Sequence, residues 1–157
     1  MQHRMKSHQL TTDQIIRLLQ ECLTGSLATV GNDNAPYITP IHYVYKDGNI
    51  YFHGLPKGQK IGNIKANPSV SFNVYRMVGL LPDANGNPCD TNTEYQSVIA
   101  SGKAELINGA DVKRNVLDAI VNKYMPQFSG IHLPENMVNG TAVIEIKITE
   151  ITGKFWE

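Results

Sequence analysis

Apolar residues recur along the chain at two spacings, one helical and one extended, and these spacings predict its elements. The helical spacing occurs over 15–23, behind a capping box of Thr11 and Gln14 and before a terminating Gly25, and again over 112–124. Elsewhere apolar and polar residues alternate with the period of two that is typical of half-buried strands. The runs that predict strands are 26–30, 35–45, 49–54, 69–75, 94–107 and 141–154.

The stretch 36–75 holds most of the functional information. Asp47-Gly48 lies between two runs rich in Tyr, Ile and Phe, and it predicts a two-residue hairpin turn. Counting outward from this turn pairs Lys46 with Asn49, His42 with His53 and Ile41 with Gly54. Alternation then predicts one core face and one half-polar face, which meets water or a ligand. The core face holds Ile41, Tyr43, Tyr45, Ile50 and Phe52, and the other face holds His42, Val44, Tyr51 and His53.

A loop with two lysines follows the hairpin. It contains Lys57-Gly58-Gln59-Lys60 and leads into a short helix over 61–67, which Pro68 stops. A helix start offers unpaired N–H groups and a partial positive charge to an anion, so this loop is a plausible phosphate cradle. The residues alone leave a solvated loop as the alternative.

The remaining segments set the fold class. Pro36 and Pro40 remove two ladder donors, which predicts an edge or bulged strand over 35–45. Gly102 predicts a bend, 79–93 a long loop with a disordered tip, and 125–137 a connecting loop. Six or more strands with two sizeable helices predict a mostly β protein, a largely antiparallel closed sheet with flanking helices. We expect a single domain over 1–157, with residues 1–9 frayed.

Charge and composition narrow the partners. The 14 basic and 14 acidic residues cancel, which argues against nucleic acid and against an anionic membrane surface as partners. No apolar run has the length of a signal peptide or of a membrane span, so we expect a cytoplasmic protein. Cys22 lies among apolar helical positions and Cys89 in a polar loop; they form no C-x-x-C pair, and a disulfide between them stays open.

The order of these segments resembles the pyridoxamine 5'-phosphate oxidase-like family, and most closely its branch of Nim nitroimidazole-resistance proteins. The shared features are a strand ending Y-F-H-G, a G-x-K loop, a helix ending A-N-P and the strand S-V-S-F-N-V-Y. G-S-L-A-T-V at 25–30, Y-Q-S-V-I-A-S-G-K-A at 95–104 and T-A-V-I-E-I-K-I-T-E-I-T-G-K at 141–154 extend the resemblance over 10–157. The fold it implies is an FMN-binding split barrel, a six-stranded Greek-key barrel.

The resemblance also implies a cofactor site, with FMN in a groove outside the barrel at the interface of a homodimer. Lys60 corresponds to the family's phosphate-binding lysine, and His53 and Gly54 end the strand that lines the flavin. Ser97 corresponds to a polar residue on the neighbouring strand that reaches the cofactor. The strand whose backbone approaches the flavin ring holds Ile41, His42, Tyr43 and Val44.

Some of these residues have more than one interpretation. Lys57 is either a second phosphate contact or a solvated surface lysine. Trp156, with Lys154, either approaches the flavin of the partner subunit or caps the core. His42 and His53 are surface residues, metal ligands without an evident third ligand, or, as the resemblance implies for His53, a catalytic residue beside the flavin. We therefore expect no metal site.

An FMN-dependent oxidoreductase that reduces nitroaromatic or similar small acceptors is the first functional hypothesis. No general acid or nucleophile stands out in the sequence, which suits chemistry led by a cofactor. The alternatives are a non-catalytic flavin- or haem-binding module and a cofactor-free adaptor, which the neutral charge disfavours. Gln59 and the polar insertion at 85–92 depart from the family pattern. The arginine-rich substrate site of true pyridoxamine phosphate oxidases is not evident either, which argues against vitamin B6 oxidation.

Overall fold

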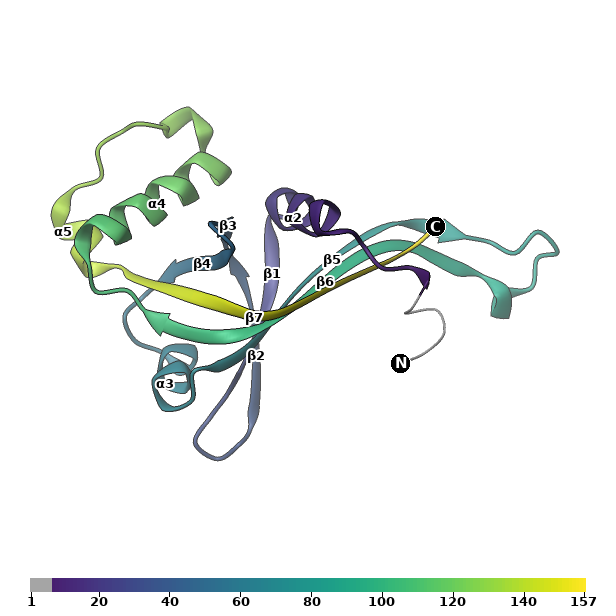
Figure 1. Cartoon of the computed structure of the whole chain (residues 1–157), viewed down its shortest axis with the longest axis horizontal. Coiled ribbons are helices and arrows are strands. Elements are labelled where there is room, and N and C mark those ends of the chain that lie inside the picture. The colour runs from purple at the N-terminus through teal and green to yellow at the C-terminus, as the bar shows by residue number, and fades with distance from the viewer. Residues whose placement is uncertain (1–6) are drawn as a thin grey trace.

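The computed structural model describes residues 7–157, which form one antiparallel sheet curled into a barrel with helices around it (Figure 1). Its seven strands lie in the order β2-β1-β5-β6-β7-β4-β3. They are β1 (Thr24–Val30), β2 (Pro36–His42), β3 (Val44–Lys46), β4 (Asn49–Gly54), β5 (Ser69–Leu81), β6 (Asn92–Leu106) and β7 (Ala142–Trp156). The helices are α2 (Thr12–Glu21), α3 (Gln59–Ala66), α4 (Ala110–Tyr124) and α5 (Glu135–Gly140), with 3₁₀ turns η1 (Pro88–Asp90) and η2 (Pro126–Phe128). The mostly β fold class predicted from the sequence is confirmed.

β2 and β3 lie at opposite ends of the strand order, although only Tyr43 separates them in the sequence. β2 pairs with β1, whereas β3 pairs with β4. A single bent strand therefore belongs to both ends of the sheet and closes the barrel. Counting β2 and β3 as one reduces the seven strands to the six expected. Pro36 and Pro40 lie on the edge segment β2, as predicted, where missing donors cost little.

Two helices fill the ends of the barrel. α2 begins with the predicted capping box, in which Thr11 accepts the N–H of Gln14 and the Gln14 side chain accepts the N–H of Thr11. The apolar side of α2 packs into the barrel core, and α3 adds Ile61 and Ile64 at the other end. Between the two helices lie the largest fully buried rings, those of Tyr43, Phe52 and Phe72.

α4 and α5 cover the outside of the sheet at β3, β4 and β7. Val44, Tyr51 and Val143 form a second apolar cluster there with residues of both helices. The hairpin face predicted to meet water or a ligand is therefore only half open, because Val44 and Tyr51 are buried while His42 and His53 are exposed. The sequence predicts the apolar face of α4. Which strands that face covers depends on the topology of the sheet.

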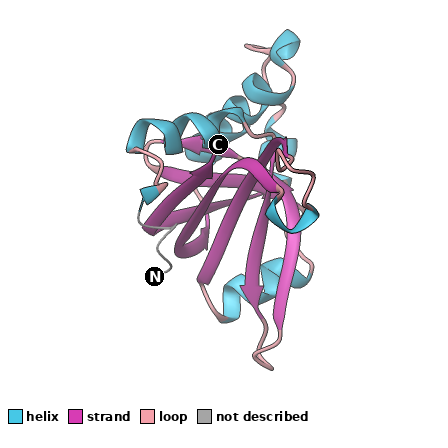
Figure 2. Cartoon of the chain, turned by 90° about the vertical axis from the view of Figure 1, so that its right-hand side faces the viewer, coloured by secondary structure: helices cyan, strands magenta, loops and turns pink. Residues whose placement is uncertain are grey.

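β5, β6 and the end of β7 extend beyond the barrel as a three-stranded arm, defined here as 74–81, 92–99 and 151–156 (Figures 1 and 2). The loop predicted over 79–93 is shorter than expected, because β5 runs to Leu81 and β6 begins at Asn92. Its tip is a turn in which the Asp83 carboxylate accepts the N–H groups of Asn85 and Asn87 at 2.9 and 3.2 Å. The local composition predicts an open loop here. In the structure, the β5–β6 ladder and this turn supply hydrogen-bond partners for backbone groups of the segment.

Three smaller expectations change. Residues 1–6 of the segment predicted to be frayed lie outside the described residues, but His8 and Leu10 bond to β7 through Phe155 and Gly153, both at 3.0 Å. α2 ends at Glu21, and Gly25 belongs to β1, where a Cβ would lie 2.1 Å from the Phe72 ring. The predicted loop over 125–137 contains η2 and the start of α5.

Both cysteines are free, with Cys22 half-buried and Cys89 exposed. Among residues 7–157 there is no helix with the length and apolar character needed to cross a membrane.

Candidate cofactor site

Lys60 lies where β4 passes into α3, beside the end of β4. Gly58 precedes α3 with a φ of 124°, which favours glycine, and no side chain caps the first turn of this helix. That turn holds no acidic residue, so its N–H groups and the Lys60 ammonium present positive charge together. A Cβ on Gly54 would lie 3.8 Å from Lys60 Nζ, which shows that the lysine reaches over the strand end. We call Gly54, Gly58, Gln59 and Lys60 the cationic corner.

The position of the cationic corner is set by buried contacts of α3. Ile61 and Ile64 are 2% and 3% exposed and pack in the barrel core. Asn63, also buried, donates to Thr29 Oγ1 at 3.0 Å and so ties α3 to β1. Lys57 is exposed on the preceding loop, whereas Lys60 is half-buried, with Nζ 5.8 Å from the centre of the Phe52 ring. The two lysines of the motif are therefore in different environments.

His42 and His53 lie near the corner, but they are not ladder partners. The β3–β4 ladder follows the predicted register from Lys46–Asn49 to Val44–Tyr51 and ends there. His42 pairs instead with Thr24 of β1, and His53 with Val143 of β7. The predicted pairs His42–His53 and Ile41–Gly54 are wrong, because the strand bends at Tyr43 and changes partner.

The His53 ring is held in its neutral form. Burial is the main cause that lowers its pKa, and the neighbouring His42 and Lys60 lower it further. A neutral imidazole has one donor and one acceptor nitrogen. Neither nitrogen is engaged in a hydrogen bond within residues 7–157, so both are available to a ligand.

Tyr124, the last residue of α4, holds the bend between β2 and β3. Its hydroxyl lies 2.8 Å from both the N–H and the carbonyl oxygen of Tyr43, and 2.6 Å from the carbonyl oxygen of Leu23. The hydroxyl accepts from the N–H and donates to a carbonyl. Its ring also lies beside that of His42, with centroids 5.0 Å apart. One side chain thus satisfies backbone groups that become free where the strand changes partner.

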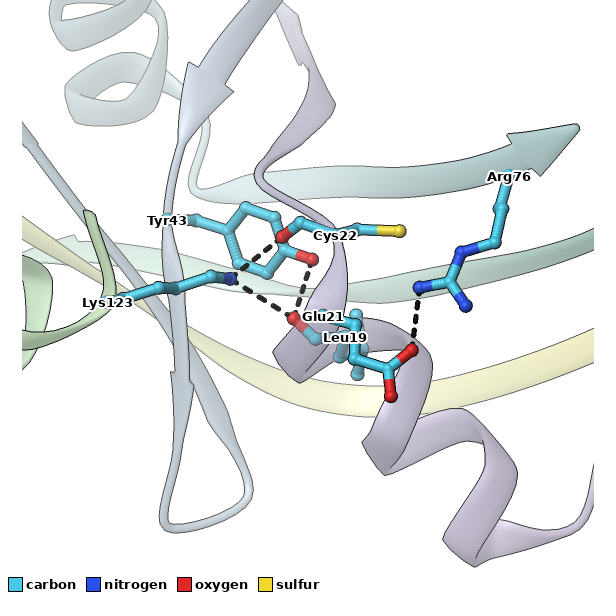
Figure 3. A network of polar contacts seen from close by, with 6 residues as sticks. All are labelled: Leu19, Glu21, Cys22, Tyr43, Arg76 and Lys123. Atoms are coloured by element: carbon cyan, nitrogen blue, oxygen red, sulfur yellow. Dashed lines mark hydrogen bonds and ion pairs between the residues drawn. The ribbon is translucent and has the colours of Figure 1, made fainter.

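Lys123 ties the same bend to α2 (Figure 3). Its Nζ donates to the carbonyl oxygens of Cys22 and Leu19 at 2.8 and 3.3 Å, and it lies 4.1 Å from the centre of the Tyr43 ring. The Tyr43 hydroxyl donates to the same Leu19 carbonyl at 2.8 Å. Burial lowers the pKa of Lys123 to about 8, against the opposing effect of Cys22, and burial raises the pKa of Tyr43.

Of the four residues predicted on the flavin-lining strand, only His42 has an exposed side chain. Ile41 and Tyr43 point into the barrel core, and Val44 is buried under α4. A ligand outside the barrel therefore reaches Ile41, Tyr43 or Val44 through the backbone alone. The backbone groups of Tyr43 are already bonded to Tyr124.

Ser97 and Trp156 lie on the arm. Ser97 pairs with Tyr75 on one side and Lys154 on the other. It is 5% exposed, yet its hydroxyl has no hydrogen-bond partner among the described residues. Leaving such a group unpaired costs about 1–3 kcal/mol, and the oxygen is covered by the chain's own atoms. Trp156 lies beside the His8 ring, with centroids 4.6 Å apart.

The predicted residues therefore form two groups, at opposite ends of β7. His53 pairs with Val143, and Ser97 pairs with Lys154, 11 residues later on the same strand. At roughly 3.3 Å per residue, this is about 36 Å of strand. A single chain brings His42, His53, Gly54 and Lys60 together, but it does not bring Ser97 or Trp156 to them.

Sequence reasoning misses Lys123 and Tyr124 as parts of this site. The sequence assigns Tyr124 only to the apolar face of a helix, yet its hydroxyl bonds to Tyr43, 81 positions away. Lys123 likewise bonds to carbonyls 101 and 104 positions away. No local pattern predicts contacts over such separations in sequence. A lysine next to a tyrosine at the end of an apolar helix is only a weak indication of them.

The sequence matches the family profile described as pyridoxamine 5'-phosphate oxidase over residues 11–155. An uncharacterized protein of Rhizobium meliloti (strain 1021) is 30% identical over 81 residues. That match covers 50% of this chain and 45% of the relative, so the likeness extends over less than half of the relative's length.

Solved structures with the same fold include the FAD and heme binding protein of Mycobacterium smegmatis, with a TM-score of 0.86 and 18% identity over 96% of this chain and 74% of that one. The flavocytochrome Anf3 of Azotobacter vinelandii has a TM-score of 0.82 and 21% identity, covering 94% and 68%. A candidate 5-nitroimidazole antibiotic resistance protein of Bacteroides thetaiotaomicron has a TM-score of 0.80 and 21% identity, covering 93% and 85%. At these identities the likeness establishes the fold.

Proposed function

The chain belongs to the pyridoxamine 5'-phosphate oxidase family, and from this premise we propose that it binds FMN and acts as an FMN-dependent oxidoreductase. The observation that carries the proposal is the cationic corner. An uncapped helix start, a lysine in its first turn and a glycine at the adjacent strand end supply what a flavin phosphate needs. Lys60 is the residue that we assign to the phosphate, and the exposed Lys57 contributes less.

A second copy of the chain completes the proposed site. The arm exposes Tyr75, Met77 and Ile99, which are 54%, 52% and 47% exposed, and it holds the unpaired Ser97 hydroxyl. In a two-fold homodimer, the arm of one copy lies against the cationic corner of the other. This arrangement brings the strands that carry Ser97 and Trp156 of the second copy to the flavin.

In this proposal the chain binds and orients the cofactor, and the cofactor supplies the chemistry. A bound flavin supplies hydride or electron transfer. Lys60 would hold the anionic tail, and the backbone of the edge strand β2 at Ile41 and His42 would contact the ring. His53, whose pKa is lowered by burial and by the neighbouring His42 and Lys60, would offer one hydrogen-bond donor to the bound group without adding positive charge.

We propose a nitroaromatic or similar small molecule as the electron acceptor. The support is the resemblance to the nitroimidazole-resistance branch and the shared fold of the Bacteroides protein. A cytoplasmic location is part of the same proposal.

A non-catalytic flavin- or haem-binding module is the second candidate. It is favoured by the fold shared with the FAD and heme binding protein of Mycobacterium smegmatis and with the flavocytochrome of Azotobacter vinelandii. A split barrel supports both uses, because the fold alone does not specify a reaction.

The visible absorption spectrum of the purified protein tests the proposal. A yellow protein that releases fluorescent flavin on denaturation supports both candidates, and chromatography of the released flavin distinguishes FMN from FAD. Reduction by NADH or NADPH followed by turnover of a nitroaromatic supports the enzyme over the binding module. A colourless protein whose thermal unfolding is not shifted by FMN overturns both.

A further inference from the structure

An apolar cavity of about 190 Å³ lies between β4, α4 and α5, with His53 at one side. Its other lining residues are Leu117, Ile120, Val121, Leu133, Met137, Val138 and Thr141. None of these carries a formal charge. The cavity lies between the sheet and the helices that cover its outer face, and none of its lining residues belongs to the cationic corner on α3.

The floor of the cavity is part of the packed helix layer. Leu117, Ile120 and Val138 are 9%, 7% and 1% exposed, and all three belong to the second apolar cluster. Met137 is 61% exposed and stands at the rim. The floor is therefore fixed by packing, whereas the rim includes a flexible thioether, which makes favourable contacts with aromatic rings.

Only one polar group of the lining is fully available. The Thr141 hydroxyl donates to the carbonyl oxygen of Met137 at 2.8 Å, so its proton is already used. The His53 ring makes no hydrogen bond within the described part of the chain, and it is neutral for the reasons given above. It offers one donor and one acceptor to a molecule in the cavity.

We propose that this cavity binds a small uncharged molecule with a single aromatic ring, whose amide or similar polar group bonds to His53. An apolar cavity of about 150 Å³ accommodates benzene, so 190 Å³ accommodates one ring with a short substituent. The volume is below the roughly 300 Å³ at which pockets for larger ligands begin, which excludes the three-ring flavin. The absence of charged lining residues selects against ions, because burying an unpaired charge is costly. The cavity shares His53 with the proposed flavin site, but its other lining residues lie outside that site, so the inference does not depend on a bound flavin.

Benzamide and benzoate are matched probes, because they share shape and differ in charge at pH 7.5. Titration of each into the purified full chain, with and without saturating FMN, is followed by methyl NMR of Ile, Leu, Val and Met. We expect benzamide to shift the methyl signals of Leu117, Ile120, Val138 and Met137, and to bind at least about tenfold more tightly than benzoate, which corresponds to about 1.4 kcal/mol.

Variants of lining residues, with one control, test whether benzamide binds in this cavity. Met137→Trp fills it from an exposed rim position and is expected to weaken benzamide binding about tenfold or more, while Met125→Trp, at an exposed position outside the lining, leaves it within about twofold. His53→Ala is expected to weaken benzamide about three- to tenfold but to leave toluene unchanged, because toluene forms no hydrogen bond.

Three results overturn the proposal: shifts that map outside the lining, benzoate binding as tightly as benzamide, or unchanged affinity in Met137→Trp. Circular dichroism of each variant shows that a loss is not due to unfolding. If Met137→Trp does not fold, Val121→Phe fills the same cavity from the half-buried rim of α4 and gives the equivalent result.

Discussion

Lys60 is the side chain on which the proposed cofactor site depends most, and Lys57 is its natural comparison. Lys60→Ala removes a charge-assisted contact to phosphate, worth about 1.5–3 kcal/mol, so we expect FMN affinity to fall about 10- to 100-fold. Lys57→Ala changes an exposed loop residue, and we expect less than about a threefold effect. Fluorescence titration of FMN measures both constants, and equal affinities in the two variants would refute the assignment of Lys60.

Tyr124 supports the bend at Tyr43 through its hydroxyl alone. Tyr124→Phe leaves the ring in place but frees the N–H of Tyr43, so we expect the free energy of unfolding to fall by about 1–3 kcal/mol. Tyr37→Phe is the control, since the Tyr37 hydroxyl makes no hydrogen bond within residues 7–157, and it is expected to change stability by less than about 0.5 kcal/mol. Urea denaturation gives both values; a Tyr124→Phe protein as stable as Tyr37→Phe would show that the bend needs no such support.

The residues of the cationic corner are predictable from the sequence because they are local. Gly54, Gly58 and Lys60 lie within seven positions, and the turn at Asp47-Gly48 sets the register of the strand before them. Two features are not predictable in this way: the distance of Ser97 from the cationic corner, and the hydrogen bonds by which Tyr124 holds the bend at Tyr43. They depend on how a 15-residue strand and a distant helix are placed, which no local spacing records.

At the scale of elements, α4 joins the strand bend to the end of α2 through Lys123. The pKa of this amine is about 8 in the folded chain, below its ordinary value of 10.5. Between these values the unfolded chain holds more protons, so the contribution of Lys123 to the free energy of unfolding rises with pH.

The pH dependence of Lys123→Met tests this coupling. We expect the stability of the unaltered protein relative to Lys123→Met to increase between about pH 8 and 10, since the cost of burying the ammonium is relieved as it loses its proton. Urea denaturation at each pH measures the difference, with the exposed Lys57→Met as the control. A difference that stays flat or falls over this range would mean that Lys123 is not desolvated at the junction.

The bend of the β6–β7 ladder depends on Gly102. A Cβ there would lie 2.3 Å from the backbone oxygen of Lys147, at the point where the register shifts. We expect Gly102→Ala to lower the free energy of unfolding by about 1–3 kcal/mol. Gly62→Ala in α3 meets nothing within 4 Å and is expected to raise it by about 0.4–1 kcal/mol. Chemical denaturation of both proteins is the measurement, and the same sign for both changes would contradict this explanation.

The elements themselves are largely predictable, and their extents are less so. The capping box places the start of α2, the hairpin turn places β3 and β4, and Gly102 marks a bend. The arm is underestimated because Gly79 and the polar stretch 82–93 interrupt the alternation of apolar and polar residues, whereas the ladder between β5 and β6 continues to Leu81 and Asn92. The change of partner at Tyr43 is hidden because alternation continues through it, and only the closure of the barrel requires the break.

At the scale of the whole molecule, the proposed function requires more than one chain. His53, beside the cationic corner, and Ser97, on the arm, pair with residues of β7 that lie about 36 Å apart along the strand. The exposed apolar residues of the arm favour contact with a second copy. The sequence resemblance implies a homodimer, but no pattern in the residues alone predicts that the site is divided between arm and corner.

Subunit mixing tests this division most directly. Lys60→Ala damages the corner and Trp156→Ala damages the arm, so at a suitable FMN concentration neither homodimer is expected to bind. After equal mixing and exchange, half of the dimers carry both variants, and each of these has one intact corner facing one intact arm. FMN binding to about one quarter of all sites, measured by fluorescence quenching, is the predicted result. Binding that stays at the level of the separate variants would contradict a flavin site shared between two copies of the chain.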